Sequence, residues 1–577
     1  MKRKVELLSN GLFSKKIMDS RIKTLSVSKK EYILGHLIGP LGLIFVVNTI
    51  AALVEKFFTQ QVGLMYGLDN TNMVQLMGNR YGVIMTIAKI LAIFVGVLNG
   101  WLIQHTNSKQ GRLRPWHLIF GFVTLIIGGT IFLFSGDSLG EAYWYYFFFL
   151  LIMYHTVGSV FFYLFRDTIV SLSSRDSQDK AKLTFIRKVS WTLISGIIIG
   201  MIISMVVLPM WLEHDISGYA VLLIALSIIS IPLLFMEYYY TRERVSEDYS
   251  IETKQDKDKK IPLKTQLKAL MTNKYYVIFI ILLTLGGIVD NFKGGNVQYF
   301  YIKFLLGGET DYSMYTIYQV ITGIPLGLGA IFIYPLSKKF GIRNVSIIGF
   351  AAVFIGSIIG WMFPSNLPIA LVAGFLRQLG MIPNAYIIIA LLYYSFDSVE
   401  HKSGLRLEGL LGVAVIVAIQ AAIWAPFAGG FEAGILRRGF VDVVGVTASD
   451  SVKDFMVMSF YMFDLILAAS YLILLPFMDV EKHLPEINST LLLRKKEAVL
   501  ATGGTWIEPE EEKRLEAEKQ AILHEENRII DLRQRCLDKG LDFDRENNKY
   551  LAAKAKKEAK KTAKLAKKEA KHKKKTD

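Results

Sequence analysis

Long apolar segments recur along this chain and constrain its fold more than any other feature. About twelve of them occur between Ile33 and Phe477, and 52% of the 577 residues are hydrophobic. A helix needs about 20 residues to cross about 30 Å of hydrocarbon, and in lipid each crossing segment must satisfy its own backbone hydrogen bonds. We therefore predict an all-α polytopic membrane protein, with transmembrane helices near 33–62, 81–104, 116–135, 143–165, 189–211, 218–239, 275–304, 313–335, 344–363, 367–394, 408–435 and 455–478.

Basic residues gather in alternate connections between these segments, which predicts the orientation of the chain. Lys and Arg are frequent before the first segment and in every second connection, whereas the intervening connections are neutral or acidic. Arg437 and Arg438, in the last outer connection, are the exception. Because short cytoplasmic connections carry the excess of Lys and Arg, both termini are predicted to be cytoplasmic. The net charge of +16 is then mainly a signal of topology, and nucleic-acid binding is not expected.

The longest internal hydrophilic segment divides the apolar segments into six and six. Six plus six is the usual plan of transporters whose halves move against each other around a central site. The expected parts are a basic cytoplasmic N-terminus (1–30), a first six-helix bundle (31–240), a cytoplasmic middle loop (241–274), a second bundle (275–479) and a charged cytoplasmic tail (480–577).

The tail has two features of its own. Residues 505–537 combine acidic residues with apolar residues at helical spacing, which is typical of an amphipathic helix or a short coiled coil. The last 27 residues contain 12 Lys against three acidic side chains. Binding to the anionic inner leaflet and a simply solvated tail both fit this composition. The single cysteine, Cys536, excludes an intramolecular disulfide and a cysteine-based metal cluster.

Several motifs resemble the glycoside-pentoside-hexuronide cation symporter family of the major facilitator superfamily, to which melibiose permease belongs. GRLRPW at 111–116 is similar to the loop after that family's second helix. Lys180, Leu183 and Arg187 match the loop after its fourth helix, and FYIKFLLG at 300–307 resembles the end of its seventh. KSGLRLEG at 402–409 resembles the loop between its tenth and eleventh helices, so the resemblance covers about residues 30–480.

The resemblance implies a major facilitator fold of about 12 helices and a transporter working by alternating access, secondary active or facilitative. The implied substrate is a small organic solute, with a sugar or glycoside expected, and the implied location is a bacterial plasma (inner) membrane. Phosphate-binding loops, metal-ligand spacings and nucleophile elbows are missing from the sequence, so an enzyme is not expected. Two alternatives remain open, a non-transporting sensor or scaffold and a transporter of a lipid-like amphiphile.

The sequence departs from the family at its cation site. Where the family carries aspartates in helices one, two and four, our alignment places His36, Ala92, Gly96 and Gly158, and its helix-eleven lysine falls at Gln420 or Ala421. No carboxylate is retained, and carboxylate oxygens are the ligands that suit sodium. No cofactor or metal is expected, and a coupling ion, H⁺ or Na⁺, would bind elsewhere.

Candidate site residues are polar, charged or aromatic side chains inside the apolar segments. A charge inside the membrane costs free energy, so the residues that carry one there are expected to have a function. Asp290 and Lys293 are three residues apart and could instead neutralise each other, and each histidine could be a neutral structural residue. Arg187 matches an arginine of the family's sugar site, and its alternative is a charge that only sets topology. The substrate-binding candidates are Arg187, Tyr154, Asp290, Lys293, Tyr301, Gln420 and Trp424, and the coupling candidates are His36, His155 and Asp290.

Basic loops at the cytoplasmic ends are candidates for gating. Guanidinium groups there could bond carbonyls or carboxylates of the neighbouring bundle in one state and release them in the other. The alternative is charge that only sets topology. The gating candidates are Arg112, Arg114, Lys180, Arg406 and Glu408.

Overall fold

A computed structural model describes the chain from residue 16 to residue 556 and residue 559, with internal gaps. The gaps are 25–26, 68–69, 107, 109, 135, 175–181, 184–185, 188, 192–201, 213–214, 245–261, 295, 310, 312, 405–410, 444–445, 502–505 and 507–508. Within the described residues every regular element is a helix, as the apolar segments predicted.

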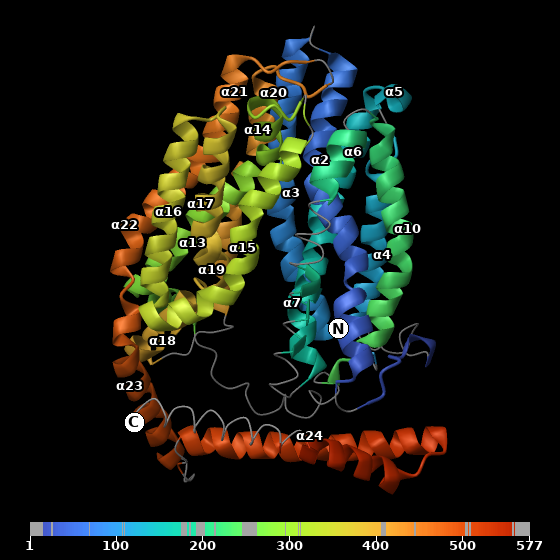
Figure 1. Ribbon diagram of the computed structural model, residues 1–577, viewed down its shortest axis with the longest axis vertical. Helices are drawn as coiled ribbons and strands as arrows, with labels where there is room; N and C mark the ends of the chain where they lie inside the picture. Colours follow the sequence, from blue (N-terminus) through green and yellow to red (C-terminus); the bar gives the residue numbers. More distant parts are fainter. Residues whose placement is uncertain are drawn as a thin grey trace.

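The first group of helices comes from the N-terminal part of the chain and the second from the C-terminal part (Figure 1). The first group consists of η2 (Lys16–Met18), η3 (Glu31–Ile38), α2 (Leu41–Tyr66), α3 (Thr71–His105), α4 (Arg114–Thr130), α5 (Gly136–Leu139), α6 (Ala142–Met153), η4 (Tyr154–Gly158), α7 (Ser159–Ser173), η6 (Ile203–Leu212) and α10 (Ser217–Tyr240).

The second group is followed by two tail helices. It consists of α12 (Leu263–Met271), α13 (Lys274–Lys293), α14 (Val297–Leu305), α15 (Ser313–Phe340), α16 (Ile342–Met362), α17 (Leu367–Tyr386), α18 (Ala390–Ser403), α19 (Leu411–Trp424), η7 (Ala425–Phe427), α20 (Gly430–Arg437), α21 (Asp450–Val457), η8 (Met458–Met462), α22 (Phe463–Leu474) and η9 (Leu475–Phe477). The tail forms α23 (Val480–Ala501) and α24 (Pro509–Lys539).

The number of helices long enough to span a membrane is close to the predicted number. In the described part of the chain nine helices are long and apolar enough, or ten if the bent pair Ser313–Gly329 and Phe332–Phe340 is one span. Of the other two predicted spans, α4 has 17 residues, and the span at 189–211 is interrupted by 192–201, which lie outside the described residues. Twelve spans therefore stay a prediction.

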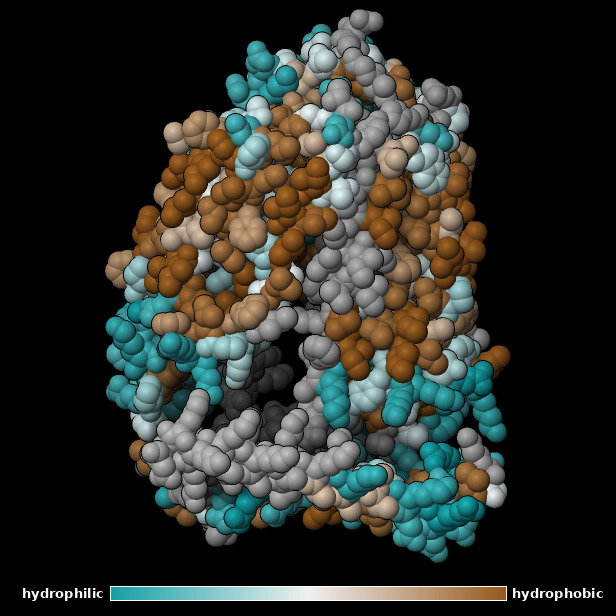
Figure 2. All heavy atoms as spheres, in the orientation of Figure 1, coloured by the Kyte–Doolittle hydropathy of each residue, from teal (hydrophilic) through white to brown (hydrophobic). Residues whose placement is uncertain are grey.

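The two groups meet at one end and separate at the other. We call the end with α5, α20 and α21 the outer end, because the sequence predicts its connections to be extracellular, and the end with α23 and α24 the inner end (Figure 1). Figure 2 shows a hollow between the groups toward the inner end. At the outer end α3 packs closely on α20, and a Cβ on Gly78 would lie 2.8 Å from Leu436 Cβ.

Two predicted spans are interrupted near the outer end. The span at 275–304 is divided into α13 and α14, with Gly294 at φ +57° between them. The span at 408–435 is divided into α19, η7 and α20, with Gly429 at φ +64°. Interrupted helices at membrane depth are tolerated where protein covers the free backbone groups, and transporters use them at binding sites. The two breaks place the N-termini of α14 and α20 inside the protein.

One carboxylate caps the start of a span in each group of helices at the inner end. Glu243, which follows α10, accepts hydrogen bonds from the backbone N–H groups of Arg112, Leu113 and Arg114 at 2.7–3.0 Å. Glu481, after the last span of the second group, accepts from Ile342 and Arg343 at 2.8 Å. A negative group is favourable there because the first N–H groups of a helix have no partner within the helix.

A glycine leaves space for each of these capping carboxylates. Gly111 has φ +103° and a Cβ on it would lie 2.4–2.6 Å from the Glu243 carboxylate, while Gly341 has φ +82° and a Cβ there would lie 3.2 Å from Glu481. The same arrangement, a glycine turn capped by a distant glutamate, thus recurs in the two groups.

A second inner-end contact joins the start of α13 to the segment before α23. Lys274 Nζ lies 3.0 Å from Asp479 Oδ1. Partial burial acts to raise the pKa of Asp479, but hydrogen bonds from Lys274 and Tyr275 outweigh it and lower the pKa to about 2. Asp479 is therefore charged at neutral pH and holds α13 against the end of the second group.

We expect Glu243→Gln and Glu481→Gln each to lower the free energy of unfolding by about 1–3 kcal/mol, because a charged acceptor for several backbone N–H groups is replaced by a neutral one. Thermal unfolding of the purified protein in detergent measures the effect. Glu486→Gln, at an exposed position on α23, is the control and should have little effect. Equal stability of all three variants would contradict the capping role.

Candidate functional site

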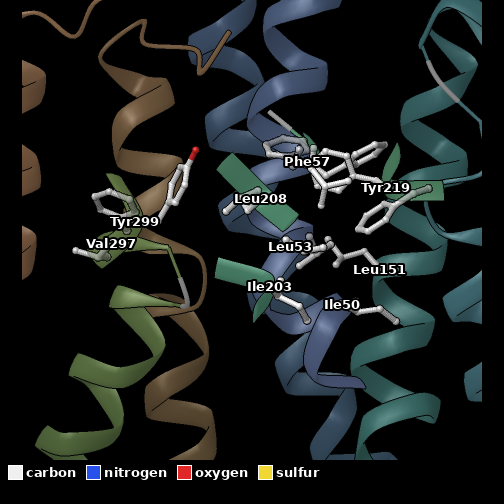
Figure 3. Packing of buried hydrophobic residues seen from close by; sticks show 14 of the residues in the cluster. Ile50, Leu53, Phe57, Leu151, Ile203, Leu208, Tyr219, Val297 and Tyr299 are labelled. Atoms are coloured by element: carbon white, nitrogen blue, oxygen red, sulfur yellow. The ribbon is translucent and has the colours of Figure 1, made fainter. Parts of the chain in front are cut away.

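A cavity of about 150 Å³ lies where four elements of the two groups meet. Its walls come from α2 and η6 of the first group and from α14 and α15 of the second. Figure 3 shows Ile203 and Leu208 beside Leu53, facing Tyr299 across a gap. The lining residues are Ala52, Leu53, Ile203, Leu208, Asn296, Gln298, Tyr299, Ile302, Tyr315 and Gln319. The volume is below the usual range of about 300–1,000 Å³ for small-molecule sites, so this region is nearly closed.

The cavity wall of the second group combines amides with aromatic rings. Gln298 Nε2 donates a hydrogen bond to Gln319 Oε1, and the rings of Tyr299 and Tyr315 stack with their centroids 5.2 Å apart. Amides both donate and accept hydrogen bonds, as sugar hydroxyls require, and aromatic faces contact the apolar faces of sugar rings. This wall has the chemistry needed to bind a hydroxylated ring.

A buried ion cluster joins the two groups next to the cavity. Lys56 of α2 is fully buried and forms an ion pair with Asp442, in the segment after α20. Lys303 of α14 reaches the same carboxylate at 2.7 Å. The Lys56 ammonium also lies 4.6 Å and 5.3 Å from the ring centroids of Tyr299 and Phe300. A lysine of the first group is thus held by a carboxylate and two aromatic rings of the second.

A second buried contact between the groups involves two carboxyl groups. Glu55 of α2 and Glu432, in the first turn of α20, are both buried and lie close enough for their charges to interact. Asn296 Nδ2 lies 3.4 Å from Glu55 Oε2, and a Cβ on Gly294 would lie 2.5 Å from the same oxygen. The interruption before α14 therefore leaves room for the Glu55 carboxyl group.

The second group holds a separate ion cluster of its own. Asp464 of α22 forms ion pairs with Lys293 of α13, at 2.5 Å, and with Arg377 of α17. The carbonyl oxygen of Phe460, in the π-helical segment η8, accepts from both cations at 3.0 Å and 2.9 Å. Helical spacing allowed Asp290 to neutralise Lys293, but the counter-ion of Lys293 in the structure is Asp464, and the Asp290 side chain is exposed.

A polar network holds the inner half of the first group together. Arg187 donates to Glu237 Oε1 of α10 at 2.9 Å and lies 3.2 Å from His36 Nδ1 of η3. The other carboxylate oxygen of Glu237 lies 3.1 Å from His117 Nε2 of α4. The structure therefore joins His36 and Arg187, which the sequence had assigned to ion coupling and to substrate binding.

The gating candidates that the structure describes bond within their own group. Arg114 is buried and donates to the carbonyl oxygens of Gln110 and Tyr238. The backbone N–H of Arg112 donates to Glu243. Lys180, Arg406 and Glu408 lie outside the described residues. Gating by these residues stays a prediction, since the described hydrogen bonds of the Arg114 side chain stay within the first group.

None of the predicted substrate-binding residues lines the cavity. Tyr154 donates to the Val47 carbonyl at 2.8 Å, and the neighbouring His155 is half-buried. Tyr301 donates to the Pro364 carbonyl at 2.6 Å. Gln420 and Trp424 of α19 bond to α13, at Thr284. Their part in substrate binding or ion coupling stays a prediction.

Several charges at the contact between the groups escaped the sequence analysis. Glu55, Lys56 and Lys303 lie inside predicted spans, so the signal that identified Asp290 also applied to them. Asp442 lies in a connection, and nothing in its local sequence distinguishes it from a solvated aspartate. Only the fold brings it to Lys56, which lies 386 positions earlier in the chain.

Comparison with known proteins identifies the family. A family model described as "MFS/sugar transport protein" matches residues 35–482, which is most of the chain. The chain belongs to this family. It is 27% identical over 345 residues to the isoprimeverose transporter of Lactiplantibacillus pentosus, covering 57% of this chain and 67% of that protein. It is 25% identical over 340 residues to the raffinose carrier protein of Pediococcus pentosaceus, covering 57% of this chain and 50% of the carrier.

A solved structure confirms the fold. A D-xylose-proton symporter superimposes with a TM-score of 0.53 at 15% sequence identity, covering 79% of this chain and 99% of the symporter. The family match and this likeness confirm the major facilitator fold that the motifs predicted, and the resemblance to the symporter family is confirmed as well. The chain is a multi-pass membrane transporter of a sugar transport family and not an enzyme.

We expect Asp464→Asn to destabilise the protein by about 3–5 kcal/mol, because it leaves the two cations Lys293 and Arg377 without their counter-ion inside the protein. Lys293→Met should cost less, because Arg377 still neutralises Asp464. Thermal unfolding of both variants in the same detergent gives the comparison. A larger loss in Lys293→Met than in Asp464→Asn would contradict the assignment of Asp464 as the shared counter-ion.

Proposed function

We propose that the chain carries a glycoside across the membrane by alternating access, and that the cavity between the two groups of helices forms part of its sugar site. The observation that carries the proposal is the position of the cavity. Its walls come from both groups, so movement of one group against the other changes how tightly the cavity encloses a ligand. The hollow toward the inner end gives such a ligand a route to one side of the membrane (Figure 2).

The chemistry of the wall supports a sugar over a lipid-like amphiphile. Gln298, Gln319 and Asn296 place three amides on one side of the cavity, opposite apolar residues of α2 and η6. An apolar ligand would cover the polar atoms that the hydrogen bond between Gln298 and Gln319 leaves over, whereas hydroxyl groups could bond to them. The relatives include an isoprimeverose transporter and a raffinose carrier, so short glycosides are the first substrates to test.

Uptake by counterflow into vesicles that contain the purified protein tests this function. Vesicles are loaded with unlabelled isoprimeverose, raffinose or xylose, and entry of the same labelled sugar is followed. We expect at least one of these sugars to exchange, because the protein needs no ion gradient for exchange. If no sugar exchanges, the proposal is wrong and the sensor and lipid alternatives return.

We expect Gln298→Ala and Gln319→Ala to raise KM for the exchanged sugar by about tenfold each, since each removes an amide worth about 1–2 kcal/mol in a buried site. Gln75→Ala, at an exposed position near the start of α3, is the matched control and should leave KM unchanged. Unchanged KM in both cavity variants would place the sugar site elsewhere, for example at the predicted residues Arg187 and Tyr301.

We also propose that the Lys-rich end of the tail binds the anionic inner leaflet. Most of that segment, from 560 onward, lies outside the described residues, so the proposal rests on its composition. Helix α24 lies across the inner end in Figure 1, on the side where the leaflet is predicted to be, which supports the proposal.

A further inference from the structure

A histidine at the inner half of the first group accepts a hydrogen bond from an arginine. His36 of η3 is fully buried, and its Nδ1 atom lies 3.2 Å from Nη1 of Arg187, which comes just before the fifth predicted span. A guanidinium group has donors only and keeps its charge in proteins. Arg187 therefore donates, and His36 Nδ1 accepts with its lone pair. In the state described here the His36 ring carries no hydrogen on Nδ1 and is neutral.

The other ring nitrogen of His36 indicates a role beyond packing. A neutral imidazole whose Nδ1 accepts carries its hydrogen on Nε2. His36 Nε2 is buried and has no hydrogen-bond partner among the described residues. Buried donors are nearly always paired in native proteins, so one without a partner calls for an explanation. A ring that changes its protonation and its partners during a transport cycle would supply that explanation.

The ion pairs around His36 balance without a charge on its ring. Arg187 pairs with Glu237 at 2.9 Å, and Arg244, which also acts on His36, pairs with Glu31 at 2.8 Å. The charged and titratable members of this network within the described residues are Glu31 of η3, His117 of α4, Arg187, Glu237 of α10 and Arg244 after α10.

A proton on Nδ1 and the bond from Arg187 exclude each other. An imidazolium ion has two N–H donors and no acceptor, and it would place a second positive charge 3.2 Å from the guanidinium group. A proton can therefore bind to Nδ1 only when Arg187 has moved away, and Arg187 can return only when the proton has left. The structure holds Arg187 on the ring while a hollow lies between the groups toward the inner end (Figure 2).

We propose that His36 Nδ1 carries the proton that drives transport, and that Arg187 displaces this proton when the inner end opens. The proton binds from the outer side in a state in which Arg187 is withdrawn from the ring. On inner opening the N–H bond of Nδ1 breaks, the proton passes to water on the inner side, and an N–H group of Arg187 takes its place at the lone pair. One proton thus enters with each sugar. The inference rests on the proposed function, to which it adds a coupling ion.

Nitrogen NMR of the protein in lipid vesicles tests the position of the proton without any sugar. Ring nitrogens that carry a hydrogen differ in chemical shift from those that carry a lone pair, and comparison with His36→Gln identifies the His36 signals. We expect wild-type Nδ1 to keep its lone pair at mildly acidic pH and to be protonated at the same pH after Arg187→Gln, which removes the competing cation. Protonated Nδ1 in the wild type at neutral pH, or identical titration of the two proteins, would overturn the proposal.

Uptake driven by a pH gradient tests the coupling. Vesicles whose outside is one pH unit more acidic receive the sugar that exchanges in counterflow. One proton per sugar predicts accumulation of about tenfold inside, because one pH unit is a tenfold difference in proton concentration. His36→Gln should bring the ratio of inside to outside sugar to about one. His483→Gln, at an exposed position on α23, is the control and should keep the wild-type ratio.

A second histidine variant separates His36 from its neighbour. His117 Nε2 lies 3.1 Å from Glu237, and the amide of His117→Gln can still donate there, so this variant should keep accumulation. Exchange by each variant shows that it is folded. Loss of accumulation in His117→Gln but not in His36→Gln would overturn the proposal, as would wild-type exchange without accumulation. If no sugar exchanges, the proposed function fails, and the NMR measurement still decides whether Arg187 excludes the proton.

Discussion

The closed outer end depends on a lysine of one group of helices buried in the other. The ammonium group of Lys56 has lost all its water and is compensated by Asp442 and by the rings of Tyr299 and Phe300. An uncompensated buried charge costs several kcal/mol, whereas a paired one contributes little net stability. The two groups of helices therefore either pack so that Lys56 meets Asp442, or separate far enough for water to solvate both side chains. This ion pair is therefore either formed or fully hydrated, with few arrangements between these two states.

The irregular backbone of the second group makes this contact possible. The seventh and eleventh predicted spans break at glycines with positive φ, Gly294 and Gly429, where the residues of the first group approach closely. A Cβ on Gly429 would lie 2.6 Å from the ring of Tyr81, and one on Gly294 would overlap Glu55. The breaks turn α14 and α20 into short helices whose starts lie inside the protein. Continuous helices would have no room there for the carboxyl groups, the amide of Asn296 or the lysines.

Sequence predicted the class, the fold and most of the spans, because lipid imposes length and apolarity on every crossing helix. It could not predict the breaks, since Gly294 and Gly429 differ from other glycines of the spans only in what approaches them. The sequence also could not predict which residues pair with the buried charges. Helical spacing allowed Lys293 to pair with Asp290 on its own helix face, but its counter-ion lies 171 residues away in α22. Helical spacing indicates which side chains share a face, whereas ion pairs depend on which helices meet.

The central claim is that the ion cluster of Lys56, Asp442 and Lys303 keeps the cavity closed to the outer side. Its most direct test is the labelling of a cysteine placed at Ala52 in the cavity, in a Cys536→Ser background, by a membrane-impermeant maleimide added from the outer side. The account predicts slow labelling in this background and labelling faster by tenfold or more after Asp442→Asn, with no change after Asp311→Asn in an exposed connection. Equal labelling rates before and after Asp442→Asn would contradict it.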